Sequence, residues 1–243
     1  MNDPISPAEL APRIDHTLLK PEAQPAQIDR LCDEAIRYGF FTVCVNPVWV
    51  ARCAARLAGQ RPRICTVAGF PLGCSHPATK AADARQALDD GAAEIDMVLH
   101  YALLIAGDAD AAVRDVAAVV DTVRRARPDA LVKVILETAA LTNEQIALGC
   151  RCAASGGADF VKTSTGFHSG GGATLATVAL MRSHASELPN RAPLRVKASG
   201  GIRDLLTARA MIAAGAERLG TSSGVAIVEE ASGGAAGESR DSY

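Results

Sequence analysis

The chain has 243 residues, with 25 basic and 27 acidic side chains and a formal net charge of −2. A hydrophobic fraction of 49% supplies enough material for a core and excludes a disordered chain, and the length allows one large domain or two small ones. The near-neutral charge and the aromatic fraction of 4% argue against a nucleic-acid-binding protein, which would present a basic surface and rings that stack on bases.

Eight short segments rich in β-forming residues recur along the chain, separated by Ala-, Leu- and Arg-rich segments with the apolar spacing of helices. Several of these helices end at a glycine, such as Gly39 or Gly91, which is typical of helix C-capping before a short turn. The predicted strands are mostly continuous apolar runs, as in a parallel sheet that helices cover. They span residues 14–19, 41–46, 63–70, 94–100, 131–138, 159–165, 194–200 and 217–222.

The alternation of these strands with helices predicts a closed (β/α)8 barrel, a TIM barrel, and leaves a doubly wound open sheet as the alternative. Two features favour the barrel. No Gly-x-Gly-x-x-Gly motif follows the first strand, and polar residues gather at the carboxyl ends of many strands rather than at one switch point. We expect one barrel domain over residues 1–230, with a short N-terminal extension, and a small, polar, flexible tail over residues 231–243.

The cysteine pattern and the N-terminal residues predict a cytoplasmic protein. Seven cysteines, an odd number without paired zinc-type spacing, indicate buried reduced thiols rather than disulfides. The first residues carry no apolar leader, and no segment approaches the roughly 18 uninterrupted apolar residues of a membrane span. We therefore expect no membrane contact.

Lysine is the informative residue type, because only five of the 25 basic residues are lysine. Three of the five stand within apolar strand segments: Lys133, Lys162 and Lys197. Burying an ammonium group costs several kcal/mol unless the group is paired or loses its proton. Lys80 is predicted at an ordinary helix position, and Lys20, just after the first strand, is left unassigned.

Two lysines near the carboxyl ends of consecutive strands favour Schiff-base chemistry. A buried lysine beside another cation tends toward the neutral amine, and a neutral amine attacks a carbonyl carbon. A single strand lysine would more often be a paired core residue or a phosphate ligand. Lys162 and Lys197 together favour the nucleophile over that alternative.

Carboxylates in the same strands supply acid–base candidates. Asp96 is followed by Met-Val-Leu and is hard to place in solvent, whereas Glu94, on the same strand face, suits a strand start near water. Asp15, Lys133 and Glu137 are further polar residues in apolar strands. They form either a buried network or direct contacts with a substrate.

Three glycine-containing strand ends, at residues 164–166, 199–201 and 220–224, predict an anion site. Backbone N–H groups at such turns, with a helix N-terminus behind them, bind phosphate, and the loops after the last strands of a barrel are a frequent phosphate site. The five histidines show no metal-ligand spacing, so we expect no metal and no cofactor.

The motifs FVKTSTG and KASGGI resemble those of deoxyribose-phosphate aldolases, class I aldolases that form a Schiff base on a (β/α)8 barrel. Similar segments run in family order from residue 14 to 224: IDHTLLKPEA, TVCVNP, TVAGFPLG, GAAEIDMV, LVKVILET and GTSSG. The resemblance implies that Lys162 is the Schiff-base lysine and that Lys197 is the second lysine that favours its unprotonated form. It also implies that Asp96 donates and accepts protons through a bound water with Lys197.

The resemblance further implies a reaction and its binding residues. The reaction is reversible cleavage of 2-deoxy-D-ribose 5-phosphate to D-glyceraldehyde 3-phosphate and acetaldehyde in deoxyribonucleoside catabolism, by a homodimer or larger homo-oligomer. Some members end in a flexible tail whose final Tyr assists proton transfer, which makes Tyr243 a candidate for that role. The substrate pocket would be lined by Asp15, Cys44, Lys133 and Thr165, and the phosphate would be held by Gly166, Gly200, Gly201, Ser222 and Ser223.

One departure and two alternatives bear on this function. Some members carry a lysine directly after the Thr-Gly pair, where Phe167 and His168 stand here, and this implies a weaker grip on phosphate. A metal-dependent aldolase on the same barrel would need a cluster of His or carboxylate ligands. A non-catalytic phosphate-sensing barrel would bind its ligand without turnover. The class I aldolase is the function that the sequence favours.

Overall fold

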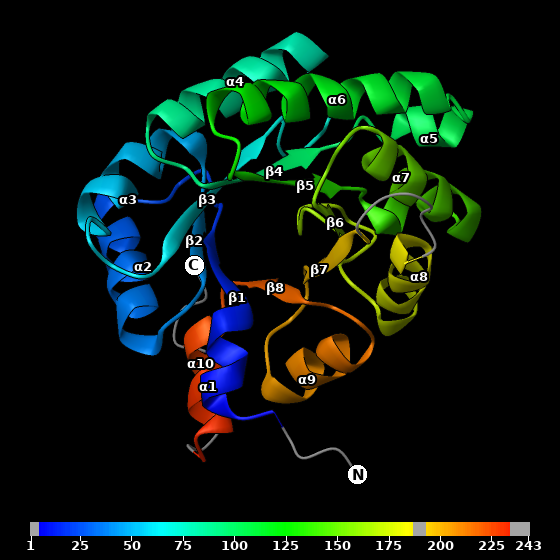
Figure 1. The fold of residues 1–243 in the computed structure, drawn as a ribbon. Coiled ribbons are helices and arrows are strands. Elements are labelled where there is room, and N and C mark those ends of the chain that lie inside the picture. The colour runs from blue at the N-terminus through cyan, green and yellow to red at the C-terminus, as the bar shows by residue number, and fades with distance from the viewer. Residues whose placement is uncertain (1–4, 187–192, 234–243) are drawn as a thin grey trace.

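The computed structural model describes residues 5–186 and 193–233. Its strands pair in parallel, each with the next along the chain, and β1 also pairs with β8, so the sheet closes into an eight-stranded barrel. The helices lie around this barrel, and the chain passes once around it from β1 to β8 (Figure 1). The predicted (β/α)8 barrel is confirmed, and the open-sheet alternative is wrong.

Each of the predicted segments contains a strand, and each strand is shorter than predicted. The clearest case is the sixth strand, predicted over residues 159–165 but formed only by Phe160–Lys162. Beyond the strand, Thr163 still donates its N–H to Lys197 of β7, and Thr165 then bonds to the side chain of Glu137 rather than to a neighbouring strand. The strands are β1 (Ile14–Leu18), β2 (Thr42–Val45), β3 (Arg63–Ala68), β4 (Glu94–Val98), β5 (Leu131–Ile135), β6 (Phe160–Lys162), β7 (Arg195–Ser199) and β8 (Arg218–Thr221).

A helix follows each strand and covers the outside of the barrel, while α1 precedes β1 and lies beside α10 (Figure 1). None of the helices in the described ranges is long and apolar enough to cross a membrane. The α-helices are α1 (Pro7–Leu10), α2 (Pro25–Tyr38), α3 (Val50–Arg56), α4 (Pro77–Asp89), α5 (Ala102–Ala106), α6 (Ala109–Ala126), α7 (Asn143–Ser155), α8 (Leu175–Ser186), α9 (Leu205–Ala213) and α10 (Gly224–Ala231), and the 3₁₀ helices are η1 (Ala11–Arg13), η2 (Pro47–Trp49) and η3 (Thr138–Ala140).

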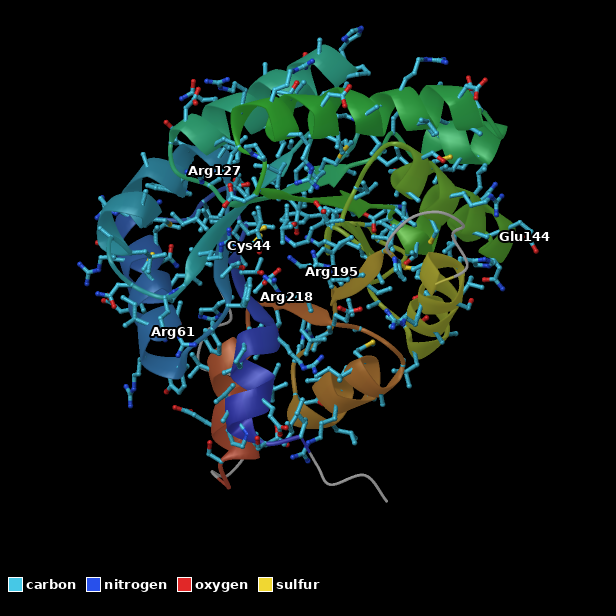
Figure 2. The ribbon with its side chains drawn as sticks, viewed as in Figure 1. Cys44, Arg61, Arg127, Glu144, Arg195 and Arg218 are labelled. Atoms are coloured by element: carbon cyan, nitrogen blue, oxygen red, sulfur yellow. The ribbon has the colours of Figure 1, made fainter. Side chains whose placement is uncertain are left out.

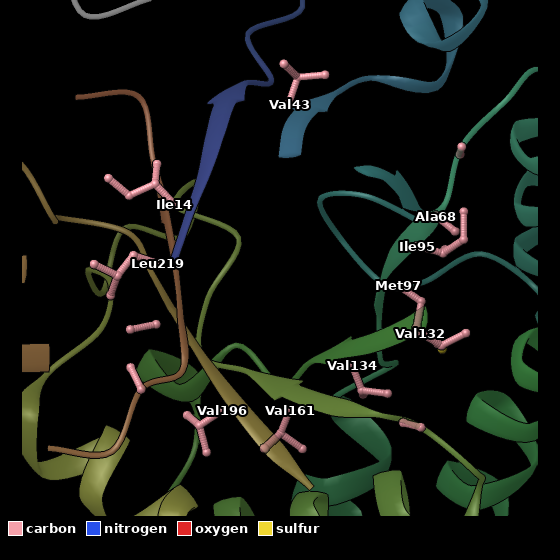
Figure 3. Packing of buried hydrophobic residues seen from close by; sticks show 14 of the residues in the cluster. Ile14, Val43, Ala68, Ile95, Met97, Val132, Val134, Val161, Val196 and Leu219 are labelled. Carbon is pink, nitrogen blue, oxygen red and sulfur yellow. The ribbon is translucent and has the colours of Figure 1, made fainter. Parts of the chain in front are cut away.

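Side chains of the strands alternate between the two sides of the barrel wall, as a period of two residues requires. In β4, Ile95 and Met97 belong to the apolar core between strands and helices, whereas Glu94 and Asp96 form ion pairs inside the barrel. Figure 3 shows the apolar side chains on the outer side of the strands, with Val161 of β6 among them. The strands are therefore not the continuous apolar runs that the sequence suggested, because the barrel interior takes the polar positions.

Lys80 is a buried ion-pair residue, which corrects its assignment to an ordinary helix position. Its Nζ atom lies 2.7 Å from Asp115 of α6 and donates to the carbonyl oxygen of Val98 at 2.9 Å, and both charged side chains are buried. Asp115 also accepts the backbone N–H of His100. The pair therefore ties α4 and α6 to the end of β4, two residues after Asp96.

We expect Lys80→Met to lower the free energy of unfolding by about 3–5 kcal/mol, because the substitution leaves Asp115 buried without its cation. The double variant Lys80→Met/Asp115→Leu removes both charges and is expected to recover part of this loss. Urea denaturation followed by circular dichroism measures both variants. A loss below about 1 kcal/mol in the single variant, the range of surface pairs, would contradict the assignment.

Candidate active site

Asp96 of β4 is the centre of an ion-pair network inside the barrel. Its Oδ1 atom lies 2.6 Å from Nζ of Lys133, and its Oδ2 atom lies 2.8 Å from Nζ of Lys162 and 2.7 Å from Nζ of Lys197. The strand register pairs Lys133 of β5 with Asp96 of β4. It also pairs Lys162 of β6 with Lys197 of β7. The three strand lysines singled out in the sequence therefore meet at one carboxylate.

Asp15, Glu94 and Arg218 extend the network to β1 and β8. The Oδ2 atom of Asp15 lies 2.5 Å from Nζ of Lys197, and its Oδ1 atom accepts two hydrogen bonds from the Arg218 guanidinium. Glu94 lies 2.6 Å from Lys133 and 3.2 Å from Arg218. Glu94 is fully buried, so its expected position near water is wrong. Figure 2 shows Arg218 within the ring of strands.

The network holds more positive than negative charge. Its four cations are Lys133, Lys162, Lys197 and Arg218, and its three carboxylates are Asp15, Glu94 and Asp96. Among the described residues Lys162 has one carboxylate partner, whereas each of the other two lysines has at least two. Lys162 is also the one lysine of the three with any exposure, 2% against 0%. It is the ammonium group that the network neutralises least.

Burial and pairing act in opposite directions on these groups, and pairing dominates. Burial disfavours the charged form of Asp96, but the ammonium groups of the lysines around it hold its pKa well below the ordinary value. Burial also opposes the charge on Lys197, yet the carboxylates of Asp15 and Asp96 raise its pKa above that of a free lysine. The pKa of Lys133 is raised in the same way, against burial, mainly by Asp96. Lys133 and Lys197 are therefore cations at neutral pH.

Cys44 and Cys65 face the network from β2 and β3. They are partners in the strand register and lie in a small apolar cluster with Leu19 and Val67. The Sγ atom of Cys65 lies 3.1 Å from Oδ1 of Asp96. The two thiols and Asp96 place three possible metal ligands within 4.8 Å of one another. Both oxygen atoms of Asp96 already accept from ammonium groups, however, which favours the Schiff-base aldolase over the metal-dependent alternative.

The predicted anion-binding turns after β6 and β7 lie against each other. Gly166 and Gly200 have φ angles of 86° and 88°, in the left-handed region that glycine adopts without steric cost. Gly172, in the loop after β6, packs so closely that a Cβ atom on it would lie 2.3 Å from the carbonyl oxygen of Gly200. The N–H of Ala173 donates to that carbonyl and holds the contact. The backbones of the two turns therefore touch directly, at a point where Gly172 leaves no room for a Cβ atom.

Several backbone donors at these turns have no partner in the described part of the chain. Across residues 5–186 and 193–233, no hydrogen bond uses the N–H groups of Gly166, Gly200, Gly201 or Ser222. Ser222 is followed by Ser223, the N-cap residue of α10, whose axis adds the positive end of a helix dipole. Unengaged N–H groups on neighbouring turns are the donors that a bound anion requires.

Glu137, at the carboxyl end of β5, holds the turn after β6. It is the one non-glycine residue with a positive φ, 58°, in the described part of the chain, a conformation that costs about 1–2 kcal/mol. Its carboxylate accepts the Thr165 N–H at 3.3 Å and the Thr165 hydroxyl at 2.5 Å. The same hydroxyl oxygen accepts the N–H of Phe167 at 3.0 Å. The Thr165 hydroxyl hydrogen is thus directed at Glu137.

The structure brings most of the sequence-predicted residues together. Those in the network are Asp15, Asp96, Lys133, Lys162 and Lys197, with Cys44 beside them, and those on the turns are Thr165, Gly166, Gly200, Gly201, Ser222 and Ser223. Their contacts with a substrate stay predictions, and Tyr243 lies outside the described residues.

Sequence reasoning missed Arg218 and Cys65 as members of the site and misplaced Glu94. Arg218 stands in a strand segment, as the three lysines do, and that position was the available signal. Arginine makes up 20 of the 25 basic residues of this chain, so an arginine within a strand stands out less than a lysine.

A closed parallel barrel with ionisable side chains at its strand ends is the architecture of a (β/α)8 enzyme. A family model described as DeoC/LacD family aldolase matches residues 11–230. The chain belongs to this family of aldolases, which are lyases. The resemblance found in the sequence motifs is thereby confirmed.

Individual relatives agree with the family. The chain is 54% identical over 220 residues to the deoxyribose-phosphate aldolase of Geobacillus sp. (strain WCH70), a match that covers 90% of this chain and 95% of the relative. It is also 54% identical over 215 residues to that of Brevibacillus brevis, covering 88% and 93%. Among solved structures, the tetrameric deoxyribose phosphate aldolase from Aeropyrum pernix has a TM-score of 0.85 at 36% identity, covering 93% of this chain and 92% of that one.

We expect Asp96→Asn to destabilise the protein more at neutral than at acidic pH. Folding lowers the pKa of Asp96, so its carboxylate contributes stability above its unfolded pKa of about 4, and the contribution is lost as the pH falls through the lower folded value. The difference in unfolding free energy between wild type and variant is expected to be about 3–5 kcal/mol at pH 7 and smaller at pH 3. Urea denaturation at the two pH values measures it, and a difference independent of pH would contradict an ionised Asp96.

Proposed function

We propose that the protein reversibly cleaves 2-deoxy-D-ribose 5-phosphate to D-glyceraldehyde 3-phosphate and acetaldehyde through a Schiff base on Lys162. The observation that carries this proposal is the position of Lys162. It is the last residue of β6, and its Nζ atom shares the carboxylate of Asp96 with the ammonium group of Lys197. The family and the names of the relatives are consistent with this reaction.

The attacking lysine must be a neutral amine. Loss of one proton removes the single excess positive charge of the network, and Lys162 has the fewest carboxylate partners. Lys133 and Lys197 keep their protons because their pKa values are raised. Once Lys162 is neutral, Asp96 and Lys197 remain as a charged pair beside the free amine, where they can move protons.

The bond changes follow from this arrangement. The amine of Lys162 attacks C1 of the open-chain sugar, and loss of water gives an iminium ion. The C3 hydroxyl then loses its proton, the C2–C3 bond breaks, and its electron pair enters an enamine in which nitrogen delocalises the charge. Protonation of the enamine at C2 and hydrolysis release acetaldehyde and restore the lysine. Asp96 and Lys197 donate and accept these protons through a bound water, a contribution of about 10²–10⁴-fold in rate.

The phosphate is proposed to bind to the backbone N–H groups at the turns after the last three strands. These turns carry unengaged donors and lie at the same end of the barrel as Lys162. Phe167 carries no charge that could bind the phosphate. Its half-exposed ring packs edge to face against the ring of Phe70, with 5.3 Å between the ring centres. The backbone N–H groups of Gly166, Gly200, Gly201 and Ser222 therefore carry the proposed phosphate contact. Ser223, whose N–H donates to the Thr221 hydroxyl oxygen at 2.9 Å, would contribute its side chain.

The wider setting is proposed on the same basis. The enzyme would act in the catabolism of deoxyribonucleosides in the cytoplasm, as a homo-oligomer. The Aeropyrum pernix relative is described as tetrameric, which supports an assembly of several chains. Tyr243 would complete the site from the tail, as predicted from the family.

Sodium borohydride with acetaldehyde is expected to trap the enzyme with an ethyl group on Lys162. Peptide mapping by mass spectrometry locates the adduct. Lys162→Met is expected to lose the adduct and to lower kcat/KM by about 10³-fold or more, because no other group forms the imine. The exposed Lys20 offers the matched control, Lys20→Arg, which should keep both. An adduct on another lysine would overturn the assignment.

Gly166→Asp is expected to weaken the binding of phosphorylated substrate, with Gly166→Asn as the uncharged control of equal size. A Cβ atom on Gly166 would meet nothing nearer than 4.0 Å, and Asn and Asp tolerate positive φ better than most residues. The KM for 2-deoxy-D-ribose 5-phosphate should be about tenfold higher in the Asp variant than in the Asn variant, owing to charge repulsion. The KM for 2-deoxy-D-ribose should match in the two. If the phosphorylated substrate also shows equal KM values, the phosphate binds elsewhere.

A further inference from the structure

We propose that Glu137 is a positioning residue that orients the anion-binding turn after β6, and that it thereby sets the preference for phosphorylated over unphosphorylated substrates. The inference rests on the proposed function, in which the Gly166 amide binds the phosphate. Glu137 itself touches no reacting atom in this scheme and acts through Thr165.

Two hydrogen bonds fix the peptide planes on either side of the Gly166 amide. The Thr165 N–H donates to the Glu137 carboxylate and fixes the plane before it. The Phe167 N–H donates to the Thr165 hydroxyl oxygen and fixes the plane after it. The Thr165 hydroxyl in turn donates to the Glu137 carboxylate, with 2.5 Å between the two oxygen atoms. One carboxylate therefore orients both peptide planes. The Gly166 N–H between them, unengaged within the described residues, is thus held in one direction.

The stability of the barrel does not account for Glu137. The side chain is buried, and in the described part of the chain no lysine, arginine or histidine forms an ion pair with it. Its backbone also adopts a positive φ that side chains disfavour. A buried carboxylate without a cation opposes folding, and so does a strained backbone. Folding stability therefore does not explain Glu137, and its hydrogen bonds to Thr165 are the feature that remains to explain it.

Backbone pairing on both sides of Glu137 is independent of its side chain. The Leu136 N–H donates to the carbonyl oxygen of Lys162, and the Thr138 N–H donates to that of Thr163. These bonds keep β5 and β6 aligned when the carboxylate is changed. The Glu137 side chain forms no hydrogen bond to Lys162 or Asp96 among the described residues. A substitution at Glu137 is therefore expected to alter the turn without altering the ion-pair network.

The test compares Glu137→Gln and Glu137→Gly with wild type on 2-deoxy-D-ribose 5-phosphate and on 2-deoxy-D-ribose. Gln keeps the size but loses one acceptor oxygen, and Gly removes the carboxylate while suiting the positive φ, so neither substitution adds side-chain volume or backbone strain. We expect KM for the phosphorylated sugar to rise about tenfold in both, as for a lost hydrogen bond to a charged group. We expect kcat and KM for the unphosphorylated sugar to stay within about twofold. Equal losses on both substrates, or no loss on either, would overturn the proposal.

Two further measurements separate this proposal from the proposed function. Titration calorimetry with inorganic phosphate should show about tenfold weaker binding in Glu137→Gln, whether or not the enzyme turns over. If wild type does not cleave 2-deoxy-D-ribose 5-phosphate but phosphate binding weakens, the proposed function fails and the positioning role stands. Unchanged phosphate affinity refutes the role. Thr165→Val removes the hydroxyl that bonds to both Glu137 and the Phe167 N–H, so it should weaken phosphate binding as well. Its loss and that of Glu137→Gln should be less than additive, because the two residues share a hydrogen bond; fully additive losses would also refute the role.

Discussion

One carboxylate shared by three lysines inside a closed barrel is the interaction on which the rest of the site depends. An ammonium group in this interior is tolerated only with a carboxylate in contact, and Asp96 provides that contact for Lys133, Lys162 and Lys197. Two oxygen atoms cannot pair one-to-one with three cations. The imbalance leaves Lys162, at the end of its strand, as the lysine whose charge is least compensated. The proposed nucleophile, Lys162, and the proposed proton carriers, Asp96 and Lys197, are therefore joined by the same short contacts.

The barrel turns this pairing into a site with two different sides. Parallel strands in register direct alternate side chains into one lumen, so the charges of β1 and of β4 to β8 meet there. The neighbouring β2 and β3 contribute Cys44, Cys65 and Val67 instead, which form an apolar cluster. In the proposed reaction a substrate between them would meet proton-transfer groups on one side and apolar side chains on the other. The backbone turns after β6, β7 and β8, with their unengaged N–H groups, add the proposed anion-binding element at the strand ends.

The sequence predicts the parts of this molecule that a local pattern determines. The eight strand segments can be recognised from their β-forming residues. The lysines within them can be recognised because an ammonium group in an apolar segment is unusual in any fold. The partners of these groups are less visible. Lys80 lies on a helix, and only the packing of α4 against α6 shows that its side chain points at Asp115. Glu94 begins a strand, a position that is often solvated. It is buried because the barrel closes and brings Lys133 and Arg218 against its carboxylate.

The choice between lysine and arginine in the interior follows the same logic. Four of the five lysines are buried, Lys80, Lys133, Lys162 and Lys197, although arginine supplies most of the positive charge of the chain. A lysine presents a compact ammonium group that donates in three directions, which suits Lys133 and Lys197 where carboxylates converge on one point. Arg218 lies between the carboxylates of Asp15 and Glu94, and the N–H groups of its planar guanidinium donate to both. In the proposed reaction Lys162 must lose its proton, and there arginine would be chemically inert because its guanidinium stays protonated. In the proposed reaction a lysine is therefore required at the end of β6 and, for proton transfer, at Lys197, whereas Lys80 and Lys133 act as charges in ion pairs.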